Sequence, residues 1–138
     1  MTYLLNIILP VLLACGALLL IVQAIGVLGD LHRQRERRHL RKSDFIDYFV
    51  SRGVSAQLAE SVHQKLNRGH YFEFEPLPTD QLISLYGIDG SDFDELLMEL
   101  ANENGLKLPA SGVLSIITVE DLLHFLTTLE PTTENANP

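Results

Sequence analysis

Four acidic residues recur at helical spacing in the second half of the chain, and their type and spacing suit a binding surface. They are Asp92, Glu95, Glu99 and Glu103, called here the acidic row. Residues three or four positions apart lie on the same side of a helix, so the four carboxylates would form one line. Such a line repels itself in the free protein and attracts positive charge. The spacing therefore predicts that the acidic row binds a basic surface on a protein partner.

Other side chains capable of chemistry form no catalytic or metal-binding pattern. The five histidines include no i, i+4 pair, and no cysteine lies at ligand spacing from them. Asp89, Asp92 and Asp94 lie close together, but no glutamate closes a twelve-residue calcium loop. No Gly-rich phosphate loop or nucleophile elbow occurs. We therefore expect no catalytic residue, no metal and no enzymatic activity.

An amphipathic helix must carry the acidic row. Apolar residues with the i, i+3, i+4, i+7, i+8 spacing of one helical face fall at Phe93, Leu96, Leu97, Leu100 and Ala101. We expect this face to pack inward. Asp89 or Ser91 would cap the helix, because a short polar oxygen can accept from the unpaired N–H groups of the first turn. Gly90 would supply a tight turn before it.

Four shorter helices are predicted around it, so the expected fold class is all-α. Their expected limits are Ser43 or Asp44 to Gly53, Ser55 to Asn67, Thr79 to Gly87, and Thr118 to Leu129. Thr118 and Asp121 resemble a capping box. Leu82, Ile83 and Leu85 are expected in the core. Residues 70–78 contain two prolines and should form a connection in which Glu73 and Glu75 stay solvated.

The residues from 79 to 126 resemble an acyl carrier protein. The run GIDGSDFDELLMEL at 87–100, LKLP at 106–109 and IITVEDLLHFL at 116–126 are similar to that family's recognition helix, connection and closing helix. The resemblance covers about half of the chain and implies a small helical bundle. Carrier proteins bear a 4′-phosphopantetheine arm on the serine of an Asp-Ser-Leu motif. In the gapless register that serine falls on Gly90, so the resemblance implies a domain without the prosthetic group, as in a family of uncharacterised bacterial carrier-like proteins.

The alternative is a functional carrier that uses Ser91 as the attachment site beside a membrane enzyme. A shift of one residue would place Ser91 at the motif position. The same shift would rotate Leu96, Leu97 and Leu100 by about 100° away from the core face. We therefore expect the gapless register and no cofactor.

Residues 2–29 contain no charged side chain, and about 20 apolar residues suffice for a helix to cross a bilayer. We expect a single transmembrane helix. A cleaved signal would need a basic start and a shorter apolar core. A second alternative is lipidation of Cys15, because Leu12 to Gly16 resemble a lipobox, but the apolar run continues for more than a dozen residues beyond Cys15.

Six basic residues follow the apolar run directly: Arg33, Arg35, Arg37, Arg38, Arg41 and Lys42. By the positive-inside rule the N-terminus faces outward and the C-terminal domain is cytoplasmic. With the bacterial resemblance, this places the protein in a bacterial inner membrane. We expect the six side chains to rest on anionic headgroups. The alternative is that they pair with the acidic row and hold it near the bilayer until a partner competes.

Charge divides the chain into unequal parts. Residues 30–42 hold six basic and two acidic residues, net +4, and residues 43–138 hold four basic and sixteen acidic residues, net −12, which together give −8. An acidic domain argues against nucleic acid, which requires a clustered basic face. We expect an anchor at 1–30, a basic juxtamembrane segment at 31–42, a carrier-like domain at 43–129 and a disordered tail at 130–138. The expected function is a docking or adaptor module for a basic partner, such as a membrane or acyl-transfer enzyme.

Overall fold

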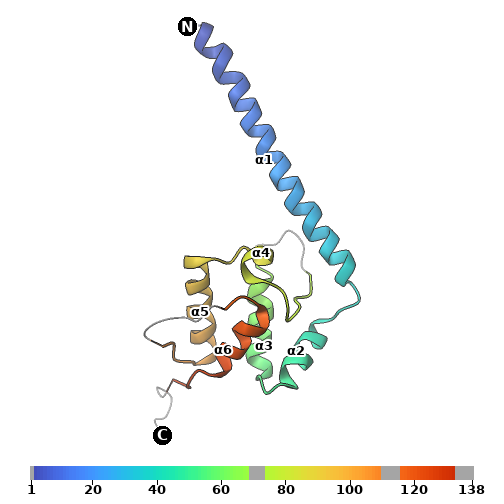
Figure 1. The fold of residues 1–138 in the computed structure, drawn as a ribbon, viewed down its shortest axis with the longest axis vertical. Coiled ribbons are helices and arrows are strands. Elements are labelled where there is room, and N and C mark those ends of the chain that lie inside the picture. The colour runs from blue at the N-terminus through green and yellow to red at the C-terminus, as the bar shows by residue number, and fades with distance from the viewer. Residues whose placement is uncertain (1, 69–73, 110–115, 133–138) are drawn as a thin grey trace.

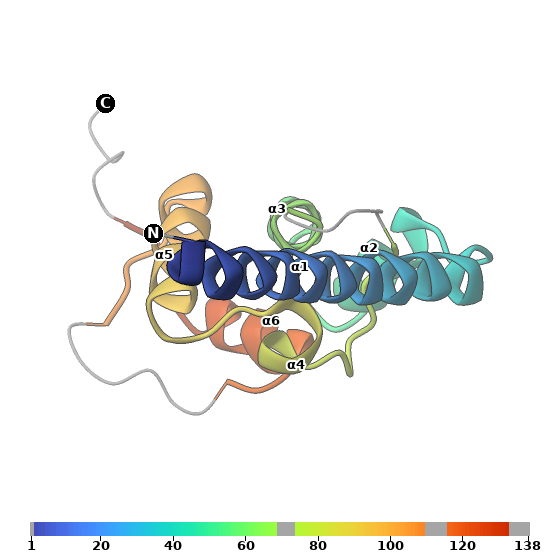
Figure 2. The same cartoon turned by 90° about the horizontal axis from the view of Figure 1, so that it is seen from above.

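The computed structural model describes residues 2–68, 74–109 and 116–132, and the regular structure within these ranges is helical (Figure 1). The helices are α1 Thr2–Arg37, α2 Lys42–Val50, α3 Ala56–Leu66, α4 Leu82–Tyr86, α5 Gly90–Asn104 and α6 Val119–Thr127. The all-α prediction, with one long apolar helix at the N-terminus, is confirmed. Seen from above, α1 passes over the other helices, with α5 and α2 towards opposite ends of the domain (Figure 2).

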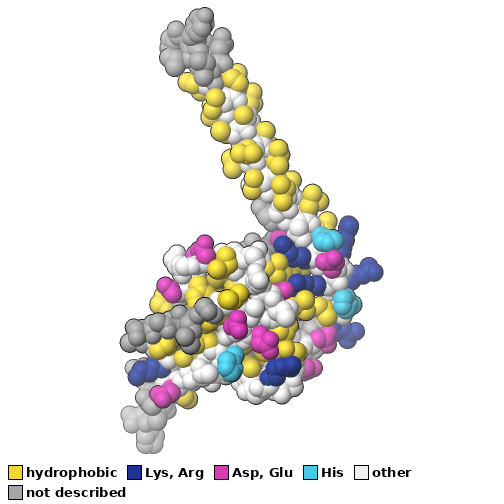
Figure 3. All heavy atoms as spheres, in the orientation of Figure 1, with side chains coloured by type: hydrophobic (Ala, Val, Ile, Leu, Met, Phe, Trp, Pro, Cys, Tyr) yellow, Lys and Arg dark blue, Asp and Glu magenta, His cyan; other side chains and the backbone are white. Residues whose placement is uncertain are grey.

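Helix α1 continues without a break from the apolar run into the basic segment. Among the described residues it is the helix long and apolar enough to cross a membrane. Its large apolar side chains from Ile8 to Leu28 are exposed, and Figure 3 shows them projecting away from the domain, with Lys and Arg gathered where α1 meets it. The basic segment continues the helix as far as Arg37 because Arg, Gln and Glu are all good helix formers.

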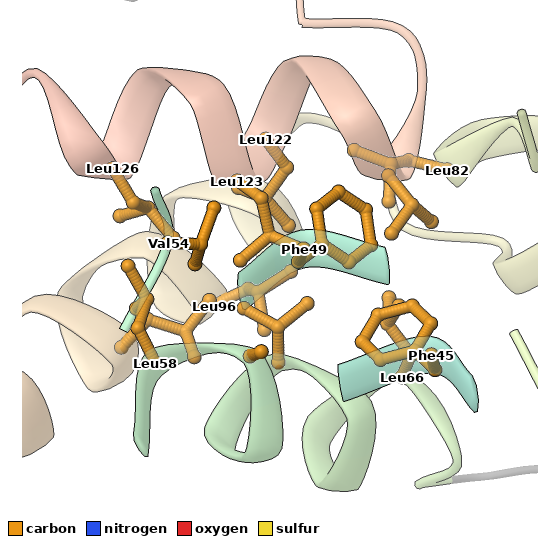
Figure 4. Packing of buried hydrophobic residues seen from close by; sticks show 14 of the residues in the cluster. Phe45, Phe49, Val54, Leu58, Leu66, Leu82, Leu96, Leu122, Leu123 and Leu126 are labelled. Atoms are coloured by element: carbon orange, nitrogen blue, oxygen red, sulfur yellow. The ribbon is translucent and has the colours of Figure 1, made fainter. Parts of the chain in front are cut away.

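The core of the domain lies where α2, α3, α5 and α6 meet (Figure 4). Its fully buried side chains include Phe49, Val62, Leu66, Leu97, Leu100, Leu122, Leu123 and Leu126. Each helix contributes one apolar face, and Phe45 packs edge-on against Phe49 at 4.9 Å between ring centroids. Burying a side chain of this size stabilises the fold by about 1.5–3 kcal/mol.

Two of the predicted helix starts are confirmed. The Ser55 hydroxyl accepts a hydrogen bond from the Leu58 N–H at 3.2 Å. Thr118 accepts from the Asp121 N–H at 3.1 Å, and the Asp121 carboxylate accepts from the Thr118 N–H at 2.9 Å, which completes the capping box. These pairs lie within three residues of one another, so sequence spacing alone identifies them.

Two other starts differ from prediction. α2 begins at Lys42, one residue before Ser43, because the Asp44 carboxylate reaches back to accept from the Arg41 N–H at 2.8 Å. The cap position of α5 is Asp89, but neither its side chain nor Ser91 bonds to the first-turn N–H groups. The backbone turn at Gly90, with φ +34°, sets the start of α5 instead.

The segment before α4 is joined to the start of α6. The backbone carbonyl of Asp80 accepts from the Val119 N–H at 3.0 Å, and that of Ile117 accepts from the Leu82 N–H at 3.0 Å. α4 is only five residues long and buries Leu82, whereas Ile83 is exposed, so the prediction of a core position for Ile83 is wrong. A five-residue helix has room for little more than one buried face.

Residues 130–132 were predicted to belong to a disordered tail, but the structure pairs them with the domain. The Lys107 N–H donates to the Glu130 carbonyl at 2.9 Å, and the Thr132 N–H donates to the Gly105 carbonyl at 2.7 Å. Residues 130–132 are therefore tied to the end of α5, which corrects the prediction of a disordered tail from residue 130. Residues 133–138 lie outside the described ranges.

Candidate docking surface

The acidic row divides into two halves with different surroundings. Asp92 and Glu95 are exposed and make no ion pair or hydrogen bond within the described residues. Glu99 and Glu103 both bind the ammonium of Lys65, at 2.6 and 2.5 Å. The structure therefore leaves the first two carboxylates available and engages the last two internally.

The side chain of Lys65 extends from α3 towards α5 and supplies the positive charge that Glu99 and Glu103 bind. Its side chain is only 6% exposed, against 38% for Glu99 and 46% for Glu103. The hydrogen bonds that Lys65 donates to Glu103 and Glu99 raise the pKa of Lys65, and the bond to Glu99 lowers the pKa of Glu99. Arg68 adds a second contact to Glu99 at 3.1 Å. These pairs hold α5 against α3 and set the direction in which α5 presents its free end.

Apolar side chains lie beside Asp92 and Glu95 in the N-terminal half of α5. A shallow depression lies between Asp92 and Glu95 on α5 and the end of α3. Ile88 and Leu96 form its apolar lining, and Lys65, Arg68 and Glu99 line it as well. Carboxylates beside apolar side chains can receive a partner's cation and its aliphatic stem together. This surface, Asp92 and Glu95 with Ile88 and Leu96, is called the α5 surface below.

The register of α5 follows the predicted core face. Leu96, Leu97, Leu100 and Ala101 are buried, and Phe93 packs against the core. Gly90 has a positive φ that residues with a Cβ rarely adopt, so a serine at this position would strain the backbone. Ser91 is exposed on the first turn of α5.

The six basic residues predicted at the membrane surface separate into two groups. Arg35, Arg38 and Arg41 are exposed, whereas Arg37 is turned inward to the domain. Arg33 is partly covered over the Phe74 ring, and Lys42 forms an ion pair with Glu60. Only the exposed group is therefore free to contact another surface, whereas the other side chains are engaged within the protein.

Arg37 is bound by residues that sequence analysis missed. Its guanidinium makes two hydrogen bonds to the Asp80 carboxylate, at 2.5 and 2.8 Å, and one to the Glu75 carbonyl at 3.0 Å. Asp80 also accepts from the Leu77 N–H and the Tyr86 hydroxyl, at 2.8 and 2.9 Å. Burial and the neighbouring Asp80 raise the pKa of Tyr86 above its ordinary range. The only sequence signal was that Asp80 follows Pro78 by two residues, a combination that is common in turns, whereas the expected helix began at Thr79.

Glu75 corrects a second prediction. Its carboxylate lies 2.7 Å from the His63 ring nitrogen, so it is bound to α3 rather than solvated. Glu73, predicted to be solvated in the same connection, lies outside the described ranges. An apolar groove of about 310 Å³ opens beside Glu75, lined mainly by Leu40, Phe45, Tyr48, Pro76, Leu77 and Pro78. In the part of the chain that the structure describes, no group of three His, Cys, Asp or Glu side chains is placed to hold a metal.

We compared the chain with protein-family models, with curated proteins and with solved structures, and none of the three comparisons found a match. Its function is therefore inferred from its own side chains.

Proposed function

We propose that the chain is a single-pass membrane protein whose helical domain docks onto a basic protein surface through α5. The domain would be an acyl-carrier-like adaptor that carries no prosthetic group. Its partner would be a membrane or acyl-transfer enzyme, and the site of action would be the cytoplasmic face of a bacterial inner membrane. Exposed Arg35 in the last turns of α1, and exposed Arg38 and Arg41 just after α1, support this orientation.

The observation that carries the proposal is the unequal neutralisation of the acidic row. Lys65 and Arg68 pair with Glu99, and Lys65 also pairs with Glu103, whereas Asp92 and Glu95 form no ion pair among the described residues. The like charges of Asp92 and Glu95 lie on one side of the helix and repel each other. A basic partner would relieve that repulsion, and its approach would be steered by the field of an acidic domain.

An adaptor is favoured over a carrier by the register of α5. The buried leucines correspond to the gapless alignment with carrier proteins, in which Gly90 occupies the place of the modified serine. With φ +34°, position 90 favours glycine over serine. The start of the helix therefore serves to position the α5 surface.

Photo-crosslinking in membranes tests the proposal. A photoreactive residue would replace Met98, which is exposed on α5 close to the α5 surface. We expect one defined protein adduct, which disappears when Asp92→Lys and Glu95→Lys are combined. The control combines Asp47→Lys and Glu130→Lys, two exposed positions outside the α5 surface that give the same change in net charge. Asp47 lies on α2, and Glu130 lies beside the opposite end of α5 from Asp92. Equal loss in both double variants, or no loss in either, would remove the α5 surface from the proposal.

A second candidate function is favoured by the exposure of Ser91. A hydroxyl on the first turn of α5 is accessible to a modifying enzyme, so a working carrier with 4′-phosphopantetheine on Ser91 is the alternative. Intact-protein mass spectrometry after co-expression with a phosphopantetheinyl transferase separates the two functions. Addition of the arm's mass, erased by Ser91→Ala, would establish the carrier. An unchanged mass would favour the adaptor.

A further inference from the structure

α4 is connected to the end of α1 through a short series of aromatic and ionic contacts. The guanidinium groups of Arg33 and Arg37 lie over the Phe74 ring, at 5.8 and 5.4 Å from its centroid. Phe74 stacks on Tyr86 of α4 at 5.9 Å, and Asp80 joins Tyr86 to Arg37. These contacts hold α4 beside residues 33–37 of α1.

The proposed anchoring gives residues 33–37 of α1 a position relative to the bilayer. The uncharged run ends at Gly29, and Arg33 follows four residues later, about 6 Å along the axis at 1.5 Å per residue. The headgroup region on each side of a bilayer is about 5–8 Å thick, from the difference between the full bilayer and its hydrocarbon core. The uncharged run is about 42 Å long as a helix, more than the hydrocarbon thickness of about 30 Å, so its charged end sets the depth. With Asp30 at the hydrocarbon boundary, Arg33 and the α4 residues held beside it lie at headgroup depth. Figure 1 shows α4 on the end of the domain from which α1 departs.

We infer that α4 is a second membrane contact, which lays the domain against the lipid surface through Ile83. This inference rests on the proposed membrane anchoring of α1. Ile83 is 65% exposed, and Ile117, on the adjoining segment, is 54% exposed. Aliphatic side chains at the boundary between headgroups and acyl chains remove apolar area from water, which stabilises the contact.

The contact is apolar in origin, because the residues that follow α4 along the chain are acidic. Asp89 and Asp92 would be repelled by anionic lipid, so the lipid contact of α4 itself does not depend on charge. Contact through Ile83 therefore persists in zwitterionic vesicles and at raised salt.

The contact also specifies the partner of the α5 surface. Only Gly87, Ile88 and Asp89 separate α4 from α5. Asp92 and Glu95 then lie just beneath the lipid surface, where they meet the juxtamembrane part of another membrane protein. The basic partner surface is therefore one that lies directly at the bilayer.

Depth-dependent fluorescence quenching tests the contact in the full chain, reconstituted in phosphatidylcholine vesicles. Cys15 is the single cysteine, so Ile83→Cys in a Cys15→Ala background carries one environment-sensitive label. Val50→Cys in the same background is the matched control, since Val50 is an exposed aliphatic residue at the end of α2 away from α4 (Figure 1). We expect a nitroxide attached near the lipid headgroup to quench the label at position 83 severalfold more than the label at position 50. The difference should remain at raised salt.

A label on native Cys15 separates this inference from the proposed anchoring. We expect strong quenching of Cys15 by a nitroxide deep in the acyl chains. If that label is not quenched, the anchoring fails and the α4 contact is overturned with it. If Cys15 is quenched but positions 83 and 50 behave alike, the anchoring stands and the α4 contact alone is overturned.

Discussion

Arg37 and Asp80, 43 positions apart in the sequence, form a two-pronged ion pair that fastens the last turn of α1 to the domain. Both nitrogens of the guanidinium fork meet the carboxylate, and the side chains are only 15% and 7% exposed. Planar pairing of this kind fixes orientation as well as distance. The domain is therefore held in one position relative to the end of α1.

Arg37→Ala should lower the free energy of unfolding by about 3–5 kcal/mol, because it leaves the buried Asp80 carboxylate without its counter-charge. Arg37→Lys should lose part of this amount, since an ammonium keeps the charge but not the fork. Urea unfolding of the full chain in detergent, followed by far-ultraviolet circular dichroism, measures both. Arg38→Ala, at an exposed neighbour, should change stability by under about 0.5 kcal/mol. Equal losses for Arg37→Ala and Arg38→Ala would contradict the assignment.

Removing the two carboxylates that bind Lys65 should lower the stability of the protein more than removing the charge of Lys65. Replacing Glu99 and Glu103 by alanine together leaves the Lys65 ammonium without these two partners and should lower the urea midpoint more than Lys65→Met does. Lys65→Met should cost under about 1 kcal/mol, because the more exposed carboxylates can be hydrated and the apolar stem is kept. Urea midpoints of the two variants measure the difference. The reverse order of stability would show that Lys65 is not the buried member.

Asp121 should make stability depend on pH in acid. Hydrogen bonds with Thr118 lower the pKa of Asp121 below its ordinary value of 3.8, so the charged form is favoured by folding. The stabilisation is present above that value and is lost as the pH falls through the lower folded pKa. Asp121→Asn should therefore cost about 0.3–1 kcal/mol at pH 7, the usual effect of a charge near a helix N-terminus, and almost nothing near pH 2. A cost independent of pH would assign the effect to shape instead of charge.

Leu100→Ala should test the register of α5. Leu100 is fully buried, and truncation of such a leucine costs about 2–5 kcal/mol. Met98→Ala, two positions earlier on the exposed side, should cost under about 0.5 kcal/mol. Unfolding curves of the two variants give the comparison. Similar costs would mean that the inward face of α5 has been misassigned.

Local features of the fold were predictable because their causes lie within a few residues. The inward face of α5 follows from the spacing of its leucines, and the starts of α3 and α6 follow from Ser55 and Thr118. α4 ends at Gly87, as predicted, and Gly87 has a positive φ. In each case the interacting atoms belong to one helical turn, so the sequence pattern contains the necessary information.

Features that depend on distant parts of the chain were not predictable. Lys65 and Glu99 are 34 positions apart, so the spacing that identified the acidic row could not show that half of it is neutralised. The pairing of residues 130–132 with the end of α5, and of Glu75 with His63, likewise required the packed helices. The expected carboxylate surface is thus reduced to Asp92 and Glu95.

Because α1 is unbroken, its orientation can determine the orientation of the domain. α1 runs unbroken to Arg37, and Arg37 is paired with Asp80 of the domain. A rotation of α1 about its axis would therefore rotate the domain with it. Under the proposed anchoring of α1, a membrane protein that turned the apolar part of α1 would turn α5 through the same angle. The direction in which Asp92 and Glu95 face would then depend on contacts made within the bilayer.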